Sequence, residues 1–319
     1  MIACASPEIL PEHRKKLEDA AGGRILICPS IDDISDEMAN EVEILIMYGG
    51  TLSYPVGTKL SVARFPRLRW IHFLTIAIDR VLREEIGQKS ILATNSTGIQ
   101  AVSMSEYVLS AMLYFEKDLH RYFALKKEKR WERRQLMGEL TNREVLIFGT
   151  GSIGTAIARV LKPFQVRLYG VNTTGKLVDP FMQTFTTAQA FERLPLADYV
   201  IAIMPDTEQT AGLFSRAQLQ RLKPSAVFIN VGRGSVLDEC ALAELLNTGR
   251  IKGAALDVFR EEPVPEDSPL WDCENLILTP HMSAKSTRYI DNCLDIFVHN
   301  LPHYRAGRRE AMINAVDRS

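Results

Sequence analysis

A glycine-rich turn near the middle of the chain constrains its fold more than any other sequence feature. Residues 149–154 read GTGSIG; they follow the apolar run EVLIF and precede TAIARVL, whose apolar residues have helical spacing. A GxGxxG turn between a strand and a helix is typical of βαβ units that bind dinucleotides, with the pyrophosphate at the helix N-terminus. The glycines permit the tight turn, the approach of the pyrophosphate and close helix–strand packing. All six residues are predicted cofactor contacts: Gly149, Thr150, Gly151, Ser152, Ile153 and Gly154.

Short apolar runs alternate with helix-like segments on both sides of this turn, a pattern that predicts parallel sheets flanked by helices. The runs before the turn lie at 24–30, 42–50, 69–75 and 89–95, and those after it lie at 166–172, 198–204, 226–232, 253–259 and 275–280. We therefore expect an α/β protein with a small unit over residues 1–95 and a larger doubly wound sheet after it. One long amphipathic helix is predicted from Ile99 to Lys127, and a last helix over 284–304 could return the chain to the first unit.

The composition argues against several classes of partner and ligand. The formal net charge of -1 offers no electrostatic case for nucleic acid or an anionic membrane, and no apolar run is long enough to span a bilayer. The first residues, MIACASPEIL, lack the pattern of a signal peptide. The cysteines are scattered and never form a CxxC pair, which favours reduced thiols in the cytoplasm. We expect no metal site, because Pro302 interrupts the helix turn between His299 and His303 and no acidic partner is evident.

Three polar residues follow strand-like runs beyond the glycine turn: Arg233 after AVFINV, Glu262 after GAALDVF and His281 after NLILTP. Each alone has an ordinary explanation, as an exposed arginine, a loop glutamate or a capping histidine. Together they match the chemistry of reducing a 2-keto acid, because ligands of open α/β sheets bind at the carboxyl ends of the strands. We predict that His281 exchanges the proton, that Glu262 stabilises its charged form and that Arg233 grips the substrate carboxylate.

The segment after the next strand bears on the choice between NAD and NADP. An acidic residue about 20 positions after the glycines would bind the ribose 2′-hydroxyl. Here the chain instead places Asn172, Thr173, Thr174 and Lys176, which could receive a 2′-phosphate without repelling it. We therefore favour NADP(H), while NAD(H) stays open because these are also ordinary turn residues.

Five motifs give the chain its resemblance to a known family: GTGSIG, MPDTEQTAGLF, FINVGRGSVLDECAL, ALDVFREEPVPEDSPLW and LTPHMSA. The chain resembles the D-isomer-specific 2-hydroxyacid dehydrogenases over nearly its whole length. The resemblance implies a Rossmann cofactor domain over 96–288, inserted into a flavodoxin-like substrate domain of residues 1–95 and 289–319, and a homodimer formed through the cofactor domain. It places Arg233, Glu262 and His281 at the catalytic positions, and Asp257 at the nicotinamide amide. It adds these residues to the cofactor pocket: Met204, Pro205, Thr207, Val231, Asp257 and Ser283.

The loop after WIHFL departs from the family pattern. Many relatives carry an Ala-Gly pair whose backbone N–H groups hold the substrate carboxylate, and here Ile76 and Ala77 take its place. We still expect this loop to bind substrate, together with Arg233 and His281, through Leu74, Thr75 and Ile76. Isoleucine changes the shape of the pocket and leaves the substrate's size open. Tyr48, before two glycines, could form a second wall of the cleft or simply end a strand.

Several functions are compatible with this family resemblance. A glyoxylate/hydroxypyruvate reductase is favoured over a general 2-ketoacid reductase and a phosphoglycerate dehydrogenase; an appended regulatory domain is not expected, because the chain ends soon after its last helix. A dinucleotide-sensing, corepressor-like protein on the same fold is the alternative from a different class. Trp131, inside the basic run 126–134, suggests packing against a partner subunit, although that run is also typical of a solvated helix end.

Overall fold

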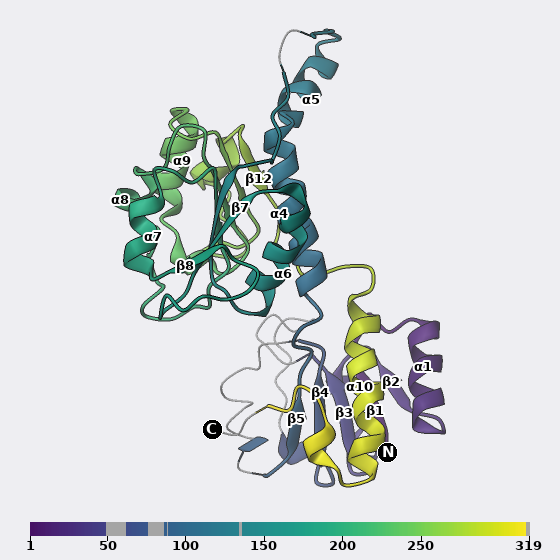
Figure 1. The fold of residues 1–319 in the computed structure, drawn as a ribbon. Helices are drawn as coiled ribbons and strands as arrows, with labels where there is room; N and C mark the ends of the chain where they lie inside the picture. The colour runs from purple at the N-terminus through teal and green to yellow at the C-terminus, as the bar shows by residue number, and fades with distance from the viewer. Residues whose placement is uncertain (49–61, 76–85, 88, 134–135, 317–319) are drawn as a thin grey trace. The chain divides into compact units, whose positions relative to one another are not determined.

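The computed structural model describes residues 1–48, 62–75, 86–87, 89–133 and 136–316, and the chain divides into two compact units (Figure 1). One unit consists of Met1–Ile99 and Ser286–Ser319, and the other of Gln100–Lys285. The first unit is therefore discontinuous, and its last segment contains the long helix α10 (Tyr289–Arg305). The predicted boundaries, after residues 95 and 288, lie a few residues from the observed ones.

The first unit contains a five-stranded parallel sheet in the order β2-β1-β3-β4-β5. The strands are β1 (Ile2–Ala5), β2 (Leu26–Cys28), β3 (Ile44–Met47), β4 (Trp70–Phe73) and β5 (Leu92–Thr94). The helices α1 (Pro11–Ala21) and α10 pack against each other, and α2 (Asp36–Ala39) is a single short turn. This order is that of flavodoxin-like sheets. The strand β1 was not predicted, because its four residues, IACA, are too few to show a period.

The second unit contains a seven-stranded parallel sheet in the order β12-β11-β10-β9-β6-β7-β8. Its strands are β6 (Glu144–Phe148), β7 (Arg167–Val171), β8 (Gln183–Phe185), β9 (Tyr199–Ala202), β10 (Val227–Asn230), β11 (Gly253–Leu256) and β12 (Leu276–Leu278). The edge strand β8 was not predicted. The α/β class and the Rossmann arrangement predicted from the glycine turn are confirmed.

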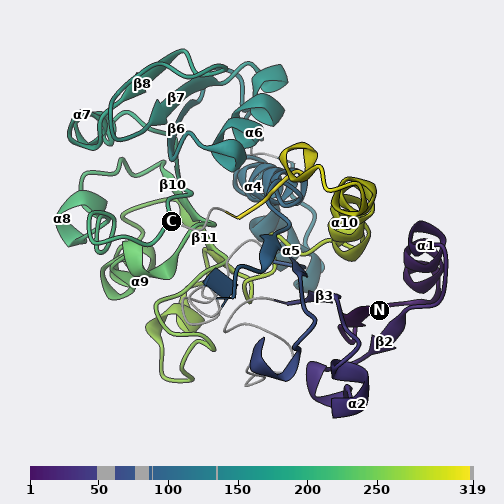
Figure 2. The same ribbon diagram turned by 90° about the horizontal axis from the view of Figure 1, so that it is seen from below.

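Helices cover both faces of this second sheet. One face is covered by α4 (Ala101–Glu116) and α6 (Ser152–Leu161), which lie together in Figure 2. The other face is covered by α7 (Thr187–Arg193), α8 (Arg216–Leu219) and α9 (Glu239–Asn247). Because both faces are covered, the central strands are mostly apolar, as in parallel sheets generally.

The single long helix predicted from Ile99 to Lys127 is wrong. The chain forms α4 and then α5 (Leu119–Lys127), with a break at Asp118, whose φ of 50° lies in the left-handed region. The apolar period continues across the break, so the pattern alone did not reveal it. Short 3₁₀ turns join other elements: Ile31–Asp33, Val62–Arg64, Lys162–Phe164, Gly234–Val236, Pro269–Asp272 and Arg309–Ala311.

No helix within the described residues is both long enough and apolar enough to cross a membrane. In the same part of the chain, no three His, Cys, Asp or Glu side chains are grouped so that they could hold a metal ion.

A buried histidine in β4 makes the stability of the first unit depend on pH. His72 is wholly buried, with Nδ1 2.9 Å from the Thr94 hydroxyl and Nε2 3.1 Å from the carbonyl oxygen of Cys293. Thr94 also accepts a hydrogen bond from the Trp70 indole. A neutral imidazole that donates from Nε2 satisfies all of these groups. Burial disfavours the charged form and lowers the pKa of His72 to about 4, against the opposing effect of the Cys293 carbonyl.

We expect acid to destabilise the native state through His72. Between about pH 6.5 and about pH 4 the unfolded chain binds a proton that native His72 does not, so the free energy of unfolding falls as the pH falls, by up to about 3 kcal/mol. Urea unfolding at several pH values in this window measures the slope. His72→Gln should reduce the slope of the unfolding free energy against pH by the equivalent of one bound proton. His299→Gln, at an exposed position, is the control. Equal slopes in His72→Gln and the parent would contradict this expectation.

Candidate active site

Each glycine of the turn after β6 meets a different structural requirement. Gly149 follows β6 with a φ of 114°, which favours glycine, and its N–H donates to Val171 O at 2.9 Å. A Cβ on Gly154 would stand 1.9 Å from the carbonyl oxygen of Gly149, so the turn closes only on a glycine. A Cβ on Gly151, the N-cap of α6, would meet no atom within 4 Å. The open space at Gly151 and the free N–H groups of α6 form a cradle that fits a pyrophosphate.

The turn after β7 is organised by Asn172. Its amide donates to the Thr150 hydroxyl at 3.1 Å and to Lys176 O at 3.0 Å. Its Oδ1 accepts from the backbone N–H groups of Thr174 and Gly175 at 3.1 and 2.7 Å. Both amide N–H groups are thus engaged, one with the glycine turn and one within the turn after β7. The predicted contact of Asn172 with a phosphate would require one of these bonds to break. The exposed residues of the turn are Thr173, Thr174 and Lys176, and none of them is acidic.

A histidine–glutamate pair stands at the carboxyl ends of two neighbouring strands. Glu262 follows β11 and His281 follows β12, and these strands are hydrogen-bonded in parallel. Nδ1 of His281 lies 2.8 Å from Oε2 of Glu262, and Oε1 of Glu262 accepts the N–H of Phe259 at 3.0 Å. Both side chains are partly exposed, 35% for the histidine and 27% for the glutamate. Within the described residues Nε2 of His281 makes no hydrogen bond, so it can exchange a proton with a ligand.

The backbone at His281 is held in an uncommon conformation by Asp257. His281 has a φ of 56°, and its N–H donates to the carbonyl oxygen of Asp257 at 2.9 Å. The Asp257 carboxylate is wholly buried and accepts from the Thr279 hydroxyl at 2.6 Å and from the N–H groups of Met282 and Ser283 at 2.8 and 2.9 Å. These bonds secure both sides of His281, which is what a non-glycine residue at positive φ requires.

Helix α4 braces the same loop from outside. The Tyr107 hydroxyl lies 2.8 Å from that of Thr279, and the Ser103 hydroxyl donates to Ser283 O at 2.7 Å. Burial raises the pKa of Tyr107 to about 12, so it is a neutral hydroxyl near neutrality. These contacts of α4 were not predicted from the sequence. The one available signal was the acidic Asp257 at the end of an otherwise apolar strand.

Arg233 follows β10, the neighbour of β11. The Arg233 backbone is fixed by Asn230, whose amide donates to Arg233 O at 2.9 Å. Nη1 donates to Gly232 O at 2.7 Å, and no carboxylate in the described part of the chain forms an ion pair with it. A Cβ on Gly234 would stand 1.8 Å from the carbonyl carbon of Phe259, so the Arg233 loop lies directly against the loop that carries Glu262.

Other predicted cofactor residues follow the same strand ends. Met204 and Val231, which come after β9 and β10, are buried, whereas Pro205 and Thr207 are exposed. Ser283 is buried in the braced loop.

The predicted substrate loop belongs to the first unit and is only partly described. Leu74 is buried; its N–H donates to Met47 O and its carbonyl accepts the Tyr289 hydroxyl, both at 2.8 Å. The carbonyl of Thr75 accepts the N–H of Ser96 at 3.1 Å. The predicted substrate contact Ile76 lies outside the described residues, as do Ala77 and the two glycines after Tyr48.

Residues 109–283 match the family model described as D-isomer specific 2-hydroxyacid dehydrogenase, NAD binding domain. The chain belongs to the D-isomer-specific 2-hydroxyacid dehydrogenase family. This dehydrogenase is therefore an NAD(P)-dependent oxidoreductase, and the resemblance stated from its motifs is confirmed. The comparisons lend no support to the corepressor alternative.

Solved structures extend the match to the whole chain. A D-isomer specific 2-hydroxyacid dehydrogenase family protein from Aeromonas salmonicida is 32% identical, with a TM-score of 0.84 over 100% of this chain and 99% of that one. A family member from Xanthobacter autotrophicus, in complex with NADPH and MES, is 27% identical, with a TM-score of 0.78 over 99% and 98%. Among curated proteins, a glyoxylate reductase of Korarchaeum cryptofilum is 29% identical over 80% of this chain and 78% of its own length.

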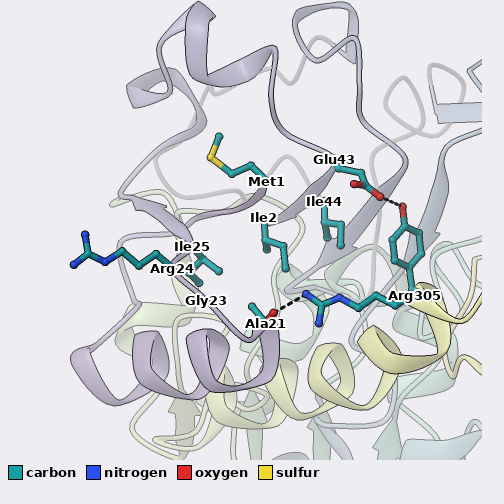
Figure 3. Close-up of a pocket in the computed structure, with 10 residues that line it drawn as sticks. Met1, Ile2, Ala21, Gly23, Arg24, Ile25, Glu43, Ile44 and Arg305 are labelled. Carbon is teal, nitrogen blue, oxygen red and sulfur yellow. Dashed lines mark hydrogen bonds between the residues drawn. The ribbon is translucent and has the colours of Figure 1, made fainter.

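A pocket of about 280 Å³ lies elsewhere in the first unit, at the amino ends of β1 and β3 (Figure 3). Ile2 and Ile44, the first residues of those strands, line it together with Glu43 and Arg305. The Tyr304 hydroxyl donates to Glu43 at 2.9 Å across this pocket. Since open parallel sheets bind ligands at the opposite, carboxyl ends of their strands, we do not assign the reaction to it.

Proposed function

We propose that this dehydrogenase interconverts a small 2-keto acid and the corresponding D-2-hydroxy acid, with His281, Glu262 and Arg233 as its catalytic residues. The observation that carries the proposal is the 2.8 Å pair of His281 and Glu262, at the same edge of the sheet as Arg233. When bound, the nicotinamide supplies or accepts the hydride. The free Nε2 of His281 gives a proton to the carbonyl oxygen during reduction and takes it back during oxidation.

In this mechanism Glu262 stabilises the charged imidazole, and Arg233 binds and polarises the substrate. Glu262 holds Nδ1 of the imidazole, and its negative charge stabilises the imidazolium that exists before proton transfer. Arg233 offers a planar set of donors that suits a carboxylate, and its position near the keto group polarises the carbonyl. Initial rates with glyoxylate, hydroxypyruvate, pyruvate, phenylpyruvate and branched 2-keto acids test the proposal. Measurable cofactor binding without turnover of any of them would overturn it.

The domain roles follow from the same proposal. Residues 96–288 form the cofactor domain, and residues 1–95 with 289–319 form the substrate domain. In the substrate domain, the loop of Leu74, Thr75 and Ile76 contacts the substrate carboxylate. The N–H of Leu74 is not one of the donors, because it donates to Met47 O. A glyoxylate/hydroxypyruvate reductase is the favoured subgroup, and the likeness to the glyoxylate reductase of Korarchaeum cryptofilum supports it.

NADP(H) is the proposed cofactor, with contacts from the glycine turn and from Thr173, Thr174 and Lys176. The lysine can form a charge-assisted bond to a 2′-phosphate, an interaction that NAD lacks. We expect Lys176→Ala to lower kcat/KM for NADPH by about tenfold and to leave that for NADH unchanged. Lys162→Ala, which removes the same charge from the end of α6, is the control. An equal loss with both cofactors, or none, would contradict the role given to Lys176.

A homodimer in the cytoplasm completes the proposal. Trp131 and Leu136 are 90% and 92% exposed, although large apolar side chains are usually covered. They lie on the segment after α5, in the cofactor unit. Four of the five cysteines are buried free thiols, as suits a reducing compartment. Sedimentation equilibrium should return the mass of two chains; a single-chain mass at micromolar concentration would contradict the dimer.

A further inference from the structure

The first unit has a topological switch point of its own, between β1 and β3. In the order β2-β1-β3-β4-β5, the chain passes from β1 outward to β2 on one side and from β3 outward to β4 on the other. Open α/β sheets bind ligands in the crevice outside the carboxyl ends of two such strands. The pairings Ala5↔Met47 and Met47↔Phe73 bring the last residues of β1, β3 and β4 to one level. The residues that follow them therefore share one edge.

Glu8 and Tyr48 flank this switch point. Tyr48 directly follows β3, is 7% exposed and donates its hydroxyl hydrogen bond to Oε2 of Glu8, 40 residues away in the sequence. The turn that carries Glu8 is ordered, because its N–H donates to the Ser6 hydroxyl at 3.2 Å and Ser6 N–H donates to Cys28 O at 3.0 Å. Burial, and then the Glu8 carboxylate, raise the pKa of Tyr48, so the phenol stays a neutral donor aimed at Glu8.

The carboxylate of Glu8 has no cationic partner among the described residues. Tyr48 occupies one of its oxygens, and Oε1 makes no hydrogen bond there. Glu8 is partly buried, and a carboxylate loses solvation in such a position without gaining a counter-charge. An unpaired negative charge at a ligand-binding edge attracts hydrogen-bond donors and repels other anions.

We infer that Glu8 is a specificity-determining residue: it accepts a hydrogen bond from a hydroxyl or ammonium group at the far end of the substrate and excludes 2-keto acids that carry a second anionic group. This inference rests on the proposed function, in which the loop that begins at Leu74 contacts the first carboxylate. Leu74 directly follows β4, two strand spacings or about 10 Å from β1, a span that a glutamate side chain and a short 2-keto acid fill together. Tyr48 is the positioning residue that keeps the carboxylate over the crevice.

The substrate class follows from the charge of Glu8. Hydroxypyruvate presents a hydroxyl to this carboxylate, whereas oxaloacetate presents a second carboxylate and phosphohydroxypyruvate presents a phosphate. We expect the enzyme to prefer hydroxypyruvate over both anionic compounds. The same charge disfavours a phosphoglycerate dehydrogenase, because a substrate phosphate at this edge would be repelled by the Glu8 carboxylate.

The experiment compares kcat/KM for hydroxypyruvate and oxaloacetate in the full-length enzyme and its variants. Glu8→Gln removes the charge and keeps the shape, and it should raise the oxaloacetate-to-hydroxypyruvate ratio by about tenfold or more. Tyr48→Phe should raise the ratio by less, since it releases Glu8 without removing the charge. Glu12→Gln, on the exposed face of α1, changes the net charge equally and should leave the ratio unchanged.

The outcomes separate this inference from the proposed function. A parent enzyme that turns over 2-keto acids and a Glu8→Gln ratio equal to that of the parent would overturn the role of Glu8 alone. A rise in the ratio with Glu12→Gln as large as with Glu8→Gln would also overturn it, because the effect would then be general electrostatics. No turnover of any 2-keto acid by the parent would overturn the proposed function, and this inference with it.

Discussion

Replacing His281 with asparagine is expected to lower kcat by about 10²- to 10⁴-fold, the usual contribution of a positioned general acid or base. Asparagine is the informative substitution, because it tolerates the positive φ of 56° at this position. The fold around the site should therefore survive while Nε2 is lost. Rates with the best substrate, together with a thermal unfolding curve, measure both effects.

Two further variants sharpen this test. Glu262→Gln keeps the geometry of the 2.8 Å contact but removes the negative charge from the imidazole, so a smaller loss in kcat, about 10- to 100-fold, is expected. His299→Ala, at an exposed position on α10, is the control and should leave kcat unchanged. Turnover in His281→Asn within a few-fold of the parent would refute the assignment of the proton to His281.

Alanine at Gly151 is expected to weaken dinucleotide binding by about 10- to 100-fold without affecting folding. The turn has room for the methyl group, since no atom lies within 4 Å of the added Cβ. That room is where the pyrophosphate is expected to approach the backbone, and a methyl group there costs the charge-assisted hydrogen bonds that depend on close approach. Titration with the dinucleotide gives the Kd, and the melting temperature should stay that of the parent.

Alanine at Gly154, in contrast, should lower the stability of the fold. Its Cβ would lie 1.9 Å from the carbonyl oxygen of Gly149, so the turn must open and stability should drop by about 1–3 kcal/mol or more. Gly23→Ala, which also meets no atom within 4 Å and lies far from this turn in the sequence, is the control for both variants. If Gly151→Ala bound the dinucleotide as tightly as the parent, the cradle would not be the pyrophosphate site.

Much of the second unit could be read from the sequence because its signals are local. The run EVLIF, the turn GTGSIG and the helix that follows are adjacent in the chain, and each glycine has its role within a few residues. Arg233, Glu262 and His281 could be singled out because each comes shortly after an apolar strand, and parallel strands bring their carboxyl ends to one edge. Position along a strand was enough to expect them near one another.

Elements that are stabilised by partners distant in the sequence were not predicted. The strand β1 is only IACA, yet it lies between β2 and β3 and is stabilised by its hydrogen bonds to both. The edge strand β8 has three residues and pairs with β7. The break at Asp118 leaves the apolar period intact, so the pattern predicted one helix where there are two.

The sequence by itself determined the fold class, the dinucleotide turn and the identity of the polar residues at the strand ends, because spacing along the chain carries that information. Only the tertiary structure decided how three side chains are used. The Asn172 amide is bound to Thr150 and to its own turn, and Asp257 anchors the left-handed backbone at His281. Glu8, after β1, accepts a hydrogen bond from Tyr48, after the neighbouring strand β3. Each of these contacts depends on hydrogen-bond geometry between groups whose separation in space cannot be read from residue type or local period.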